Sequence, residues 1–341
     1  MLPFCFGNAF EFFIVLRSES SVLNRTLGLD GSWLTLALMA VAVIPGLVLT
    51  HPAVGLAGGA VCALLLGRNP LPASTRLAKY SLQTAIVLLG LTMNAAALLA
   101  LSQAFSGAVT AYVLATILLG WGLAKLLRVD VVTGSLLTLG TAICGGTAIA
   151  ACAPFFKADA PRLAVGLGAV FLLNMVALFA FPSIGTWLGL SQLEFGAFSA
   201  LAVHDTSSVV ATAALYGEEA AEVATTVKLG RTLWLVPVLV VLGMWKNGER
   251  GRALVQRARV PFFVLAFIAA AGVATLVDLP PALVGGLKTA CKMLLVLALF
   301  FVGLELTRAT LSRISGREGL YALCLWLLVL PVAFGLVMLA A

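Results

Sequence analysis

Long apolar runs recur along the whole sequence, and they limit the possible folds more than any other feature. A helix that crosses the hydrocarbon core of a bilayer needs about 20 predominantly apolar residues. Eleven runs come close to this length or exceed it. They are residues 33–50, 53–67, 80–101, 107–127, 132–156, 163–190, 195–217, 223–245, 260–279, 283–306 and 319–340. We therefore predict an all-α polytopic membrane protein with about eleven transmembrane helices.

The scarcity of charge excludes most soluble proteins. Only 10% of the 341 residues are charged and 62% are hydrophobic, whereas an average soluble domain has about 25% charged residues. The chain cannot cover a soluble fold of this size with a polar surface, so we expect neither a soluble enzyme nor a nucleic-acid partner. The six cysteines form no CxxC pair and no cluster with histidine, and we expect no metal site and no cofactor.

Basic residues are concentrated in alternate loops, which predicts the orientation of the chain in the membrane. If the N-terminus is cytoplasmic, the inner loops hold most of the Lys and Arg residues, and this explains the net charge of +7. Lys157 and Arg162 are the exceptions, because they fall in an outer loop. Eleven spans then place the C-terminus outside.

Two of the apolar runs contain residues that interrupt a lipid-facing helix. The fifth includes Gly140–Thr147 (GTAICGGT) and the seventh includes Ala202–Ser208 (AVHDTSS). Paired glycines weaken a helix, and Thr or Ser often starts one. We predict two half-helices in each run, the second halves beginning at Thr147 and at Thr206 or Ser207. The starts of half-helices bind anions and build the sites of many secondary transporters; close helix packing at these glycines is the open alternative.

A self-match suggests an internal repeat. Leu77–Leu98 aligns with Ala290–Leu311, which places Lys79 over Lys292 and Gly90 over Gly303. The two segments are the third and tenth spans, an odd number apart, so the copies would be inverted in the membrane. We therefore predict an inverted-repeat transporter with discontinuous helices.

Four basic residues lie inside predicted spans. Lys228 and Arg231 are three residues apart, Lys288 and Lys292 are four apart, and each pair shares one helical face. Ionisable groups within the membrane are costly and mark functional sites. The alternative, chiefly for Lys228 and Lys288, is that the side chain extends along the helix and places its charged end at the membrane surface.

Few acidic residues are available to neutralise these cations within the spans. Asp205 is one and Glu305, near the end of the tenth span, is the other. We therefore expect an anion to bind transiently at these four cations. His204, next to Asp205, adds a group that titrates near neutrality, although a packing role for this histidine stays open.

Two segments carry a resemblance to a known family. They are Ile143–Pro154 with Phe155–Asp159, and Val203–Glu219 with Thr226–Arg231 and Pro237. With the order of the spans, they resemble the YeiH-like inner-membrane proteins, a family labelled as sulfate exporters. The resemblance covers most of residues 33–340. Where the family usually has His-Glu followed by a turn with Gln, this chain has His204 and Asp205, whose carboxylate reaches less far.

The resemblance implies a secondary-transporter fold related to the cation/proton antiporters and bile-acid symporters, with inverted repeats and crossed broken helices. It also implies a location in the bacterial inner membrane. We expect residues 33–341 to form one transmembrane transporter domain. For the polar or amphipathic segment 1–32, a surface helix, a twelfth span and an over-extended translation start are all open.

Together, these features predict a secondary transporter that exports a small inorganic or organic anion, such as sulfate or a related sulfur oxyanion. The expected substrate-binding residues are Gly145, Gly146, Thr147, Thr206, Ser207, Ser208, Lys228, Arg231, Lys288 and Lys292. His204 and Asp205 are expected to couple transport to a proton or sodium ion. The lipid bilayer is the other expected partner, and a homodimer is left open.

Three alternatives remain at this point. The first is a cation/proton antiporter in which Asp205 binds the cation. The second is an anion channel. The third is an intramembrane enzyme that recruits Cys144 or His204, but the sequence contains no catalytic constellation around them, and we assign no catalytic residue.

Overall fold

The computed structural model describes residues 33–246, 262–277, 280–305 and 316–341, and every element within them is an α-helix. Five helices are long and apolar enough to cross a membrane: Ala95–Leu126, Pro161–Trp187, Glu218–Trp245, Pro281–Leu304 and Arg317–Ala340. Shorter apolar helices occupy other predicted spans. The all-helical, multi-pass character is thus confirmed, whereas the count of eleven spans stays a prediction. The N-terminal segment 1–32 lies outside the described residues.

The chain divides into two compact units. Unit 1 comprises Met1–Ser81 and Val296–Arg308, and unit 2 comprises Leu82–Leu295 and Ala309–Ala341. The boundary falls inside two helices, α4 (Ser74–Gly90) and α15 (Pro281–Leu304). Whether the units act as one transporter domain stays a prediction.

Unit 1 is built by close packing of short apolar helices. It contains α2 (Trp33–Leu49) and α3 (Pro52–Leu66) with the end of α15. A Cβ atom added at Gly59 would overlap the carbonyl oxygen of Phe300, and one added at Gly303 would overlap that of Leu56. Glycine therefore allows the backbones of α3 and α15 to approach closely, as small residues do between membrane helices.

In the same unit, the carboxylate of Glu305 binds side chains at the start of α4. Glu305 accepts hydrogen bonds from Asn69 Nδ2 at 3.1 Å, from Thr75 Oγ1 at 2.7 Å and from the hydroxyl of Ser74. The negative charge thus lies at a helix N-terminus, where it is favoured. Among the described residues Glu305 therefore serves this local cluster and forms no ion pair with the four intramembrane cations.

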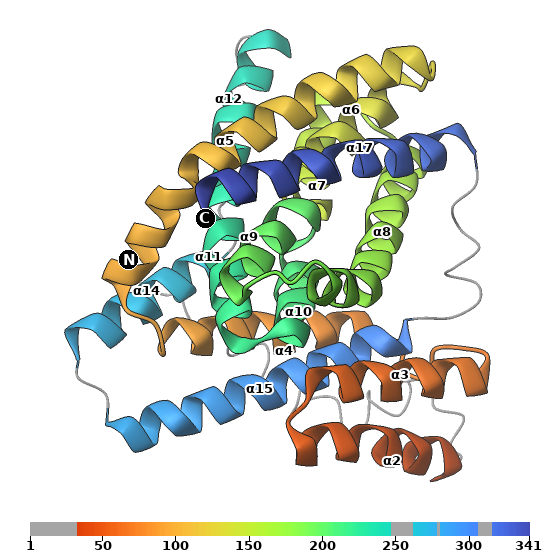
Figure 1. Ribbon diagram of the computed structural model, residues 1–341. Helices are drawn as coiled ribbons and strands as arrows, with labels where there is room; N and C mark the ends of the chain where they lie inside the picture. Colours follow the sequence, from red (N-terminus) through yellow and green to blue (C-terminus); the bar gives the residue numbers. More distant parts are fainter. Residues whose placement is uncertain (1–32, 247–261, 278–279, 306–315) are drawn as a thin grey trace, which may run out of the picture. The chain divides into compact units, whose positions relative to one another are not determined.

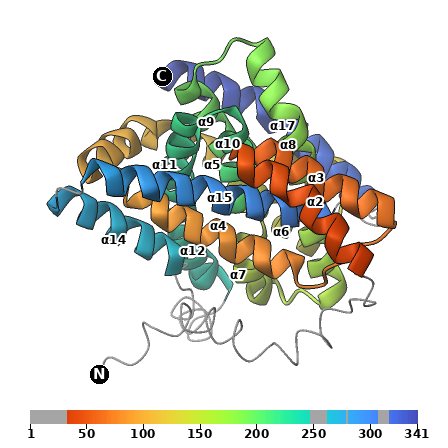
Figure 2. The same cartoon turned by 90° about the horizontal axis from the view of Figure 1, so that it is seen from below.

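Unit 2 contains four helices of 11 or 12 residues that come from two of the apolar runs (Figures 1 and 2). They are α6 (Val131–Ala142), α7 (Gly146–Phe156), α9 (Gln192–Ala202) and α10 (Thr206–Tyr216). The other helices that lie wholly in this unit are α5 (Ala95–Leu126), α8 (Ala160–Trp187), α11 (Glu218–Leu233), α12 (Leu235–Lys246), α14 (Phe262–Leu276) and α17 (Arg317–Ala340). One large cluster of buried apolar side chains runs through this unit.

Buried hydroxyl groups join three of these helices. Tyr321 on α17 donates to the carbonyl of Gly120 on α5 at 3.0 Å, and its hydroxyl lies 2.6 Å from Thr138 Oγ1 on α6. Gly120 has no side chain, which leaves room for Thr138 beside it. This contact holds α17 and α5 against the first half of the fifth predicted span.

The boundaries of the third and fourth predicted spans were wrong. The sequence pattern placed a break at residues 102–106, but α4 ends at Gly90 and α5 runs without interruption from Ala95. The reason is Asn94, whose side-chain oxygen accepts from the amide of Ala96 at 2.7 Å and caps the start of α5. The eighth span is also divided, at Trp234, because Pro237 has no N–H for the carbonyl of Leu233.

Both predicted interruptions are confirmed. In the fifth span α6 ends at Ala142 and α7 starts at Gly146, one residue before the predicted Thr147. In the seventh, α9 ends at Ala202 and α10 starts at Thr206, as predicted. Both of these predicted broken helices lie inside unit 2.

The close contact of α3 with α15 leads to a first prediction. Gly59→Ala is expected to destabilise the protein by about 1–3 kcal/mol, because the added methyl group meets backbone that cannot move aside independently. Thermal unfolding in detergent measures the change. Gly107→Ala on α5 is the control, since no atom lies within 4 Å of its added Cβ. Equal unfolding temperatures for the two variants would contradict the packing argument.

Candidate functional site

The two broken helices meet where each is interrupted. Gly145 has a φ of +62°, a conformation that side chains other than glycine rarely adopt. A Cβ atom at Gly145 would lie 3.2 Å from the amide nitrogen of Asp205 and 3.2 Å from the carbonyl carbon of His204. We call this meeting point, formed by residues 141–147 and 202–208, the helix crossing.

Arg231 on α11 binds the C-terminal ends of both first half-helices. Its guanidinium donates to the carbonyls of Thr141 and Ala142 at the end of α6, the latter at 2.9 Å. It also donates to Ala200 at 2.9 Å and Leu201 at 2.7 Å at the end of α9. One side chain, itself 0% exposed, therefore joins the ends of two helices that lie far apart in the sequence.

Lys228 and Trp326 donate further hydrogen bonds to the carbonyl groups at the end of α9. Lys228 Nζ donates to the carbonyl of Val203 at 2.8 Å and approaches that of Ala200 at 3.4 Å. Trp326 Nε1, from α17, donates to Ala202 at 2.9 Å. The last carbonyls of a helix have no partner within the helix, and here each one from Ala200 to Val203 receives a side-chain donor.

These contacts explain why the cations are buried. The C-terminus of a helix carries a partial charge of about −0.5, and buried carbonyls without partners are costly. Lys228 and Arg231 are both fully buried and three residues apart, so one face of α11 faces both negative ends. The two cations are thus positioned by the backbone of the broken helices.

The opposite ends of the breaks, where α7 and α10 begin, are only partly satisfied. Asp205 caps α10, since its Oδ2 accepts from the amide of Ser207 at 3.0 Å and from the Ser207 hydroxyl. At the start of α7 the cap position is Gly145, which offers no side-chain acceptor. Gly146 is half-buried and Thr147 exposed.

His204 lies in the second break and is almost completely buried, at 1% exposure. Asn174 Oδ1, from α8, accepts from the backbone amide of His204 at 3.0 Å and lies 3.2 Å from its ring Nδ1. The other ring nitrogen, Nε2, has no partner among the described residues. Asn174 was not anticipated from the sequence, because one asparagine in an apolar run carries no signal of its partner.

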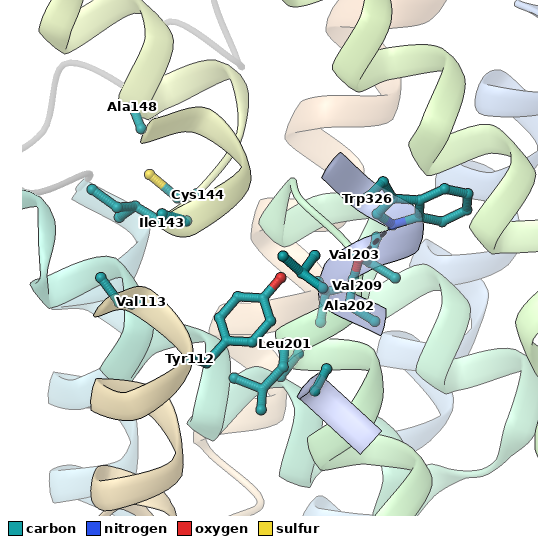
Figure 3. Close-up of a cluster of buried hydrophobic side chains, with 14 of the residues drawn as sticks. Tyr112, Val113, Ile143, Cys144, Ala148, Leu201, Ala202, Val203, Val209 and Trp326 are labelled. Carbon is teal, nitrogen blue, oxygen red and sulfur yellow. Dashed lines mark hydrogen bonds between the residues drawn. The ribbon is translucent and has the colours of Figure 1, made fainter. Parts of the chain in front are cut away.

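Tyr112 on α5 is a second residue that the sequence analysis missed. It is 0% exposed, and the guanidinium carbon of Arg231 lies 4.7 Å from the centre of its ring. Figure 3 shows Tyr112 between the labelled residues of the first break and those of the second. Its hydroxyl has no partner among the described residues. Tyr112 therefore adds an aromatic face for the guanidinium and a free hydroxyl to the crossing.

The four intramembrane cations do not form one cluster. Lys292 on α15 forms an ion pair of 2.5 Å with Glu218, the first residue of α11, and Lys288 is exposed. Lys228 lies ten residues further along α11, about 15 Å from Glu218. The structure thus brings together the predicted glycines, threonines and serines, His204, Asp205, Lys228 and Arg231, and leaves Lys288 and Lys292 at the acidic end of α11.

A cavity of about 360 Å³ lies between α5 and the pair α11–α12. Its wall includes four hydroxyl-bearing residues, Ser102, Ser106, Thr110 and Thr226. It also includes Gly230, the neighbour of Arg231 in the chain. The capping residues Lys228 and Arg231 are not part of this wall.

Outside the predicted spans, the carboxylate of Asp130 caps the start of α6, the first half of the first broken helix. Asp130 Oδ2 accepts from the amide of Thr133 at 3.0 Å and forms an ion pair of 3.0 Å with Arg162. The hydrogen bond from the Thr133 amide, with Arg162, lowers the pKa of the Asp130 carboxyl. The carboxylate thus stays ionised at the N-terminus of α6, where negative charge is favoured.

Sequence comparisons connect the chain to bacterial membrane proteins. The family described as "Conserved hypothetical protein 698" matches residues 31–322. A UPF0324 membrane protein of Geobacter sulfurreducens is 40% identical over 282 residues, which cover 82% of this chain and 89% of that protein. One from Porphyromonas gingivalis is 41% identical over 281 residues, with 82% and 84% covered. No solved structure matches the chain.

The central role of Arg231 can be tested by Arg231→Met. Carbonyls at the ends of α6 and α9 would lose their donor, and because each buried unsatisfied group costs about 1–3 kcal/mol, we expect a loss of more than about 3 kcal/mol in stability. Thermal unfolding measures it. Arg162→Met is the matched control, since Arg162 is 40% exposed in its ion pairs and its loss has little effect. A similar unfolding temperature for both variants would refute the capping role.

Proposed function

Because the chain belongs to the UPF0324 family of membrane proteins, we propose that it is a secondary transporter for a small anion, with its substrate site at the helix crossing. Sulfate or a related sulfur oxyanion is the substrate that the resemblance to sulfate exporters suggests, and export is the corresponding direction. The observation that carries this proposal is the burial of two cations at the meeting point of two broken helices.

The charge balance of the crossing favours an anion. Lys228 and Arg231 contribute two formal positive charges and Asp205 one negative charge, while His204 is counted as neutral. The partial charges of two helix starts and two helix ends cancel. One positive charge is thus left without a partner in a region of low dielectric constant, where the negative charge of an anion would compensate it.

The direct ligands of the anion would come from the backbone. The donors of Arg231 are engaged by carbonyls, and so is the ammonium group of Lys228. These cations therefore act through their charge and by holding the breaks in place. The N–H groups of Gly146 and Thr147, which no side chain at the cap position binds, would be the donors, with the hydroxyl of Ser208; the hydroxyl of Ser207 already donates to Asp205.

Alternating access would follow from an inverted repeat. The two helices of the sequence self-match, α4 and α15, are also the two that contain the boundary between the units. α4 begins in unit 1 and ends in unit 2, whereas α15 does the reverse, which supports the repeat. Motion of one repeat against the other would then expose the crossing to each side of the membrane in turn.

Ion coupling would involve His204 and Asp205, and the orientation would be that predicted by the loop charges, with a cytoplasmic N-terminus. Lys288 and Lys292 are not at the crossing, so we place them outside the substrate site. The ion pair of Lys292 with Glu218 would instead affect how α15 and α11 separate during transport.

A cation/proton antiporter is the second candidate, and one observation favours it. Asp205 is a half-buried carboxylate at the crossing, and a carboxylate in this position is a natural ligand for sodium or a proton. Its oxygen Oδ2 is engaged by Ser207, which is the N-cap interaction expected for a structural role. An anion channel would use the same site but would show a far higher turnover.

Asp205→Asn distinguishes the two transporters. Asparagine also caps helices, so α10 should persist, and removal of a repelling charge worth about 1 kcal/mol should lower the KM for sulfate or sulfite roughly fivefold. Flux into proteoliposomes measures it. Glu194→Gln, at the exposed start of α9, is the control. Loss of proton-coupled sodium flux in Asp205→Asn, without any anion flux in the parent protein, would establish the antiporter.

A further inference from the structure

We propose that Asn174 is a positioning residue that fixes the tautomer of His204, so that Nε2 of this histidine is the atom that binds the coupling proton. This proposal rests on the proposed function, since it names the atom that would link anion transport to protons. Asn174 lies on α8 and is 3% exposed, which is costly for a carboxamide unless it is hydrogen-bonded.

The orientation of the Asn174 amide follows from its backbone contact. The atom 3.0 Å from the backbone nitrogen of His204 must be an acceptor, because a backbone N–H can only donate. That atom is therefore the carbonyl oxygen Oδ1, and the reversed amide would place two donors against each other. The same oxygen lies 3.2 Å from the ring nitrogen Nδ1.

The tautomer of His204 follows in turn. An amide oxygen has no proton to give, so the contact with Nδ1 is a hydrogen bond only if Nδ1 carries the hydrogen. A neutral imidazole has one N–H, and Nε2 is then left with a lone pair. Asn174 thus sets which nitrogen of His204 is free to bind a proton.

Nε2 is buried and has no partner among the described residues. The indole ring of Trp326 is nearby, with its centre 6.4 Å from that of the imidazole, but its N–H donates to Ala202. Buried polar atoms almost always have a partner, and an exception calls for an explanation. The unpaired lone pair of Nε2 is therefore the place on this ring where a coupling proton would bind.

The charges around His204 make protonation depend on the anion. Lys228 and Arg231 on α11 both donate to the carbonyl of Val203, the residue before His204, and Asp205, the residue after it, caps α10. The neighbouring elements α8 and α17 contribute Asn174 and Trp326, which carry no charge. A bound anion would offset the added positive charge, so anion and proton would each strengthen the binding of the other. The two would then cross the membrane together.

The tautomer can be measured without any transport assay. The chain has only two histidines, so His51→Gln leaves His204 as the single imidazole for ¹⁵N NMR of the full-length protein in liposomes. We expect a protonated Nδ1 and an unprotonated Nε2 at neutral pH. In Asn174→Leu on the same background, the signals should change to Nε2–H or to a mixture. A protonated Nε2 in the parent would overturn the proposal, whatever the substrate is.

The pH profile of flux provides the functional test. Asn174→Asp keeps an acceptor for both N–H groups and adds negative charge, so the pH midpoint of sulfite or sulfate flux should shift upward by about one unit, a tenfold change in proton concentration. Asn174→Leu should lose the pH dependence. Thr186→Val, whose hydroxyl bonds within α8, should behave like the parent.

An unchanged midpoint in Asn174→Asp, with normal flux, would show that Asn174 does not act through His204. Absence of any anion flux in the parent protein would instead count against the proposed function, and the NMR result would still decide the tautomer. If Asn174→Leu fails to fold, the pH midpoint of flux in Asn174→Asp alone decides the functional test.

Discussion

The organisation of unit 2 depends on the hydrogen bonds of Arg231 with the ends of two helices. A helix that stops inside a membrane leaves carbonyl groups without partners, and water is not available there to satisfy them. Here two such ends are satisfied by one planar guanidinium with several donors, assisted by Lys228 and Trp326. Lysine alone, with three donors on one nitrogen, is less suited to two separate helix ends.

This arrangement separates the source of charge from the groups that would touch a substrate. The buried cations face the C-terminal ends of α6 and α9, whereas the amides proposed to bind the anion belong to the uncapped N-terminal end of α7. A site of this kind provides a positive environment while its contacts are made by backbone.

Much of this could be predicted from the sequence, and the limits have physical causes. Glycine pairs and polar caps revealed both breaks, because they act locally on the helix in which they occur. The start of α5 was misplaced because the cap at Asn94 competes with a hydrophobic run that continues through it. The roles of Asn174 and Tyr112 could not be predicted, since each depends on a partner from a distant segment. Lys292 was grouped with Arg231 by depth alone, and its partner Glu218 lies elsewhere.

The order of these segments in the chain has a consequence for how the protein is made. Residues 141–147 and 202–208 are synthesised before Arg231, so both breaks reach the membrane before the side chain that caps them exists. Until α11 arrives, their carbonyl groups must be satisfied by water or by the insertion machinery. Arg231 can cap the two breaks only once α11 has entered, and a nascent chain that stops before residue 231 would leave two polar helix ends without this donor.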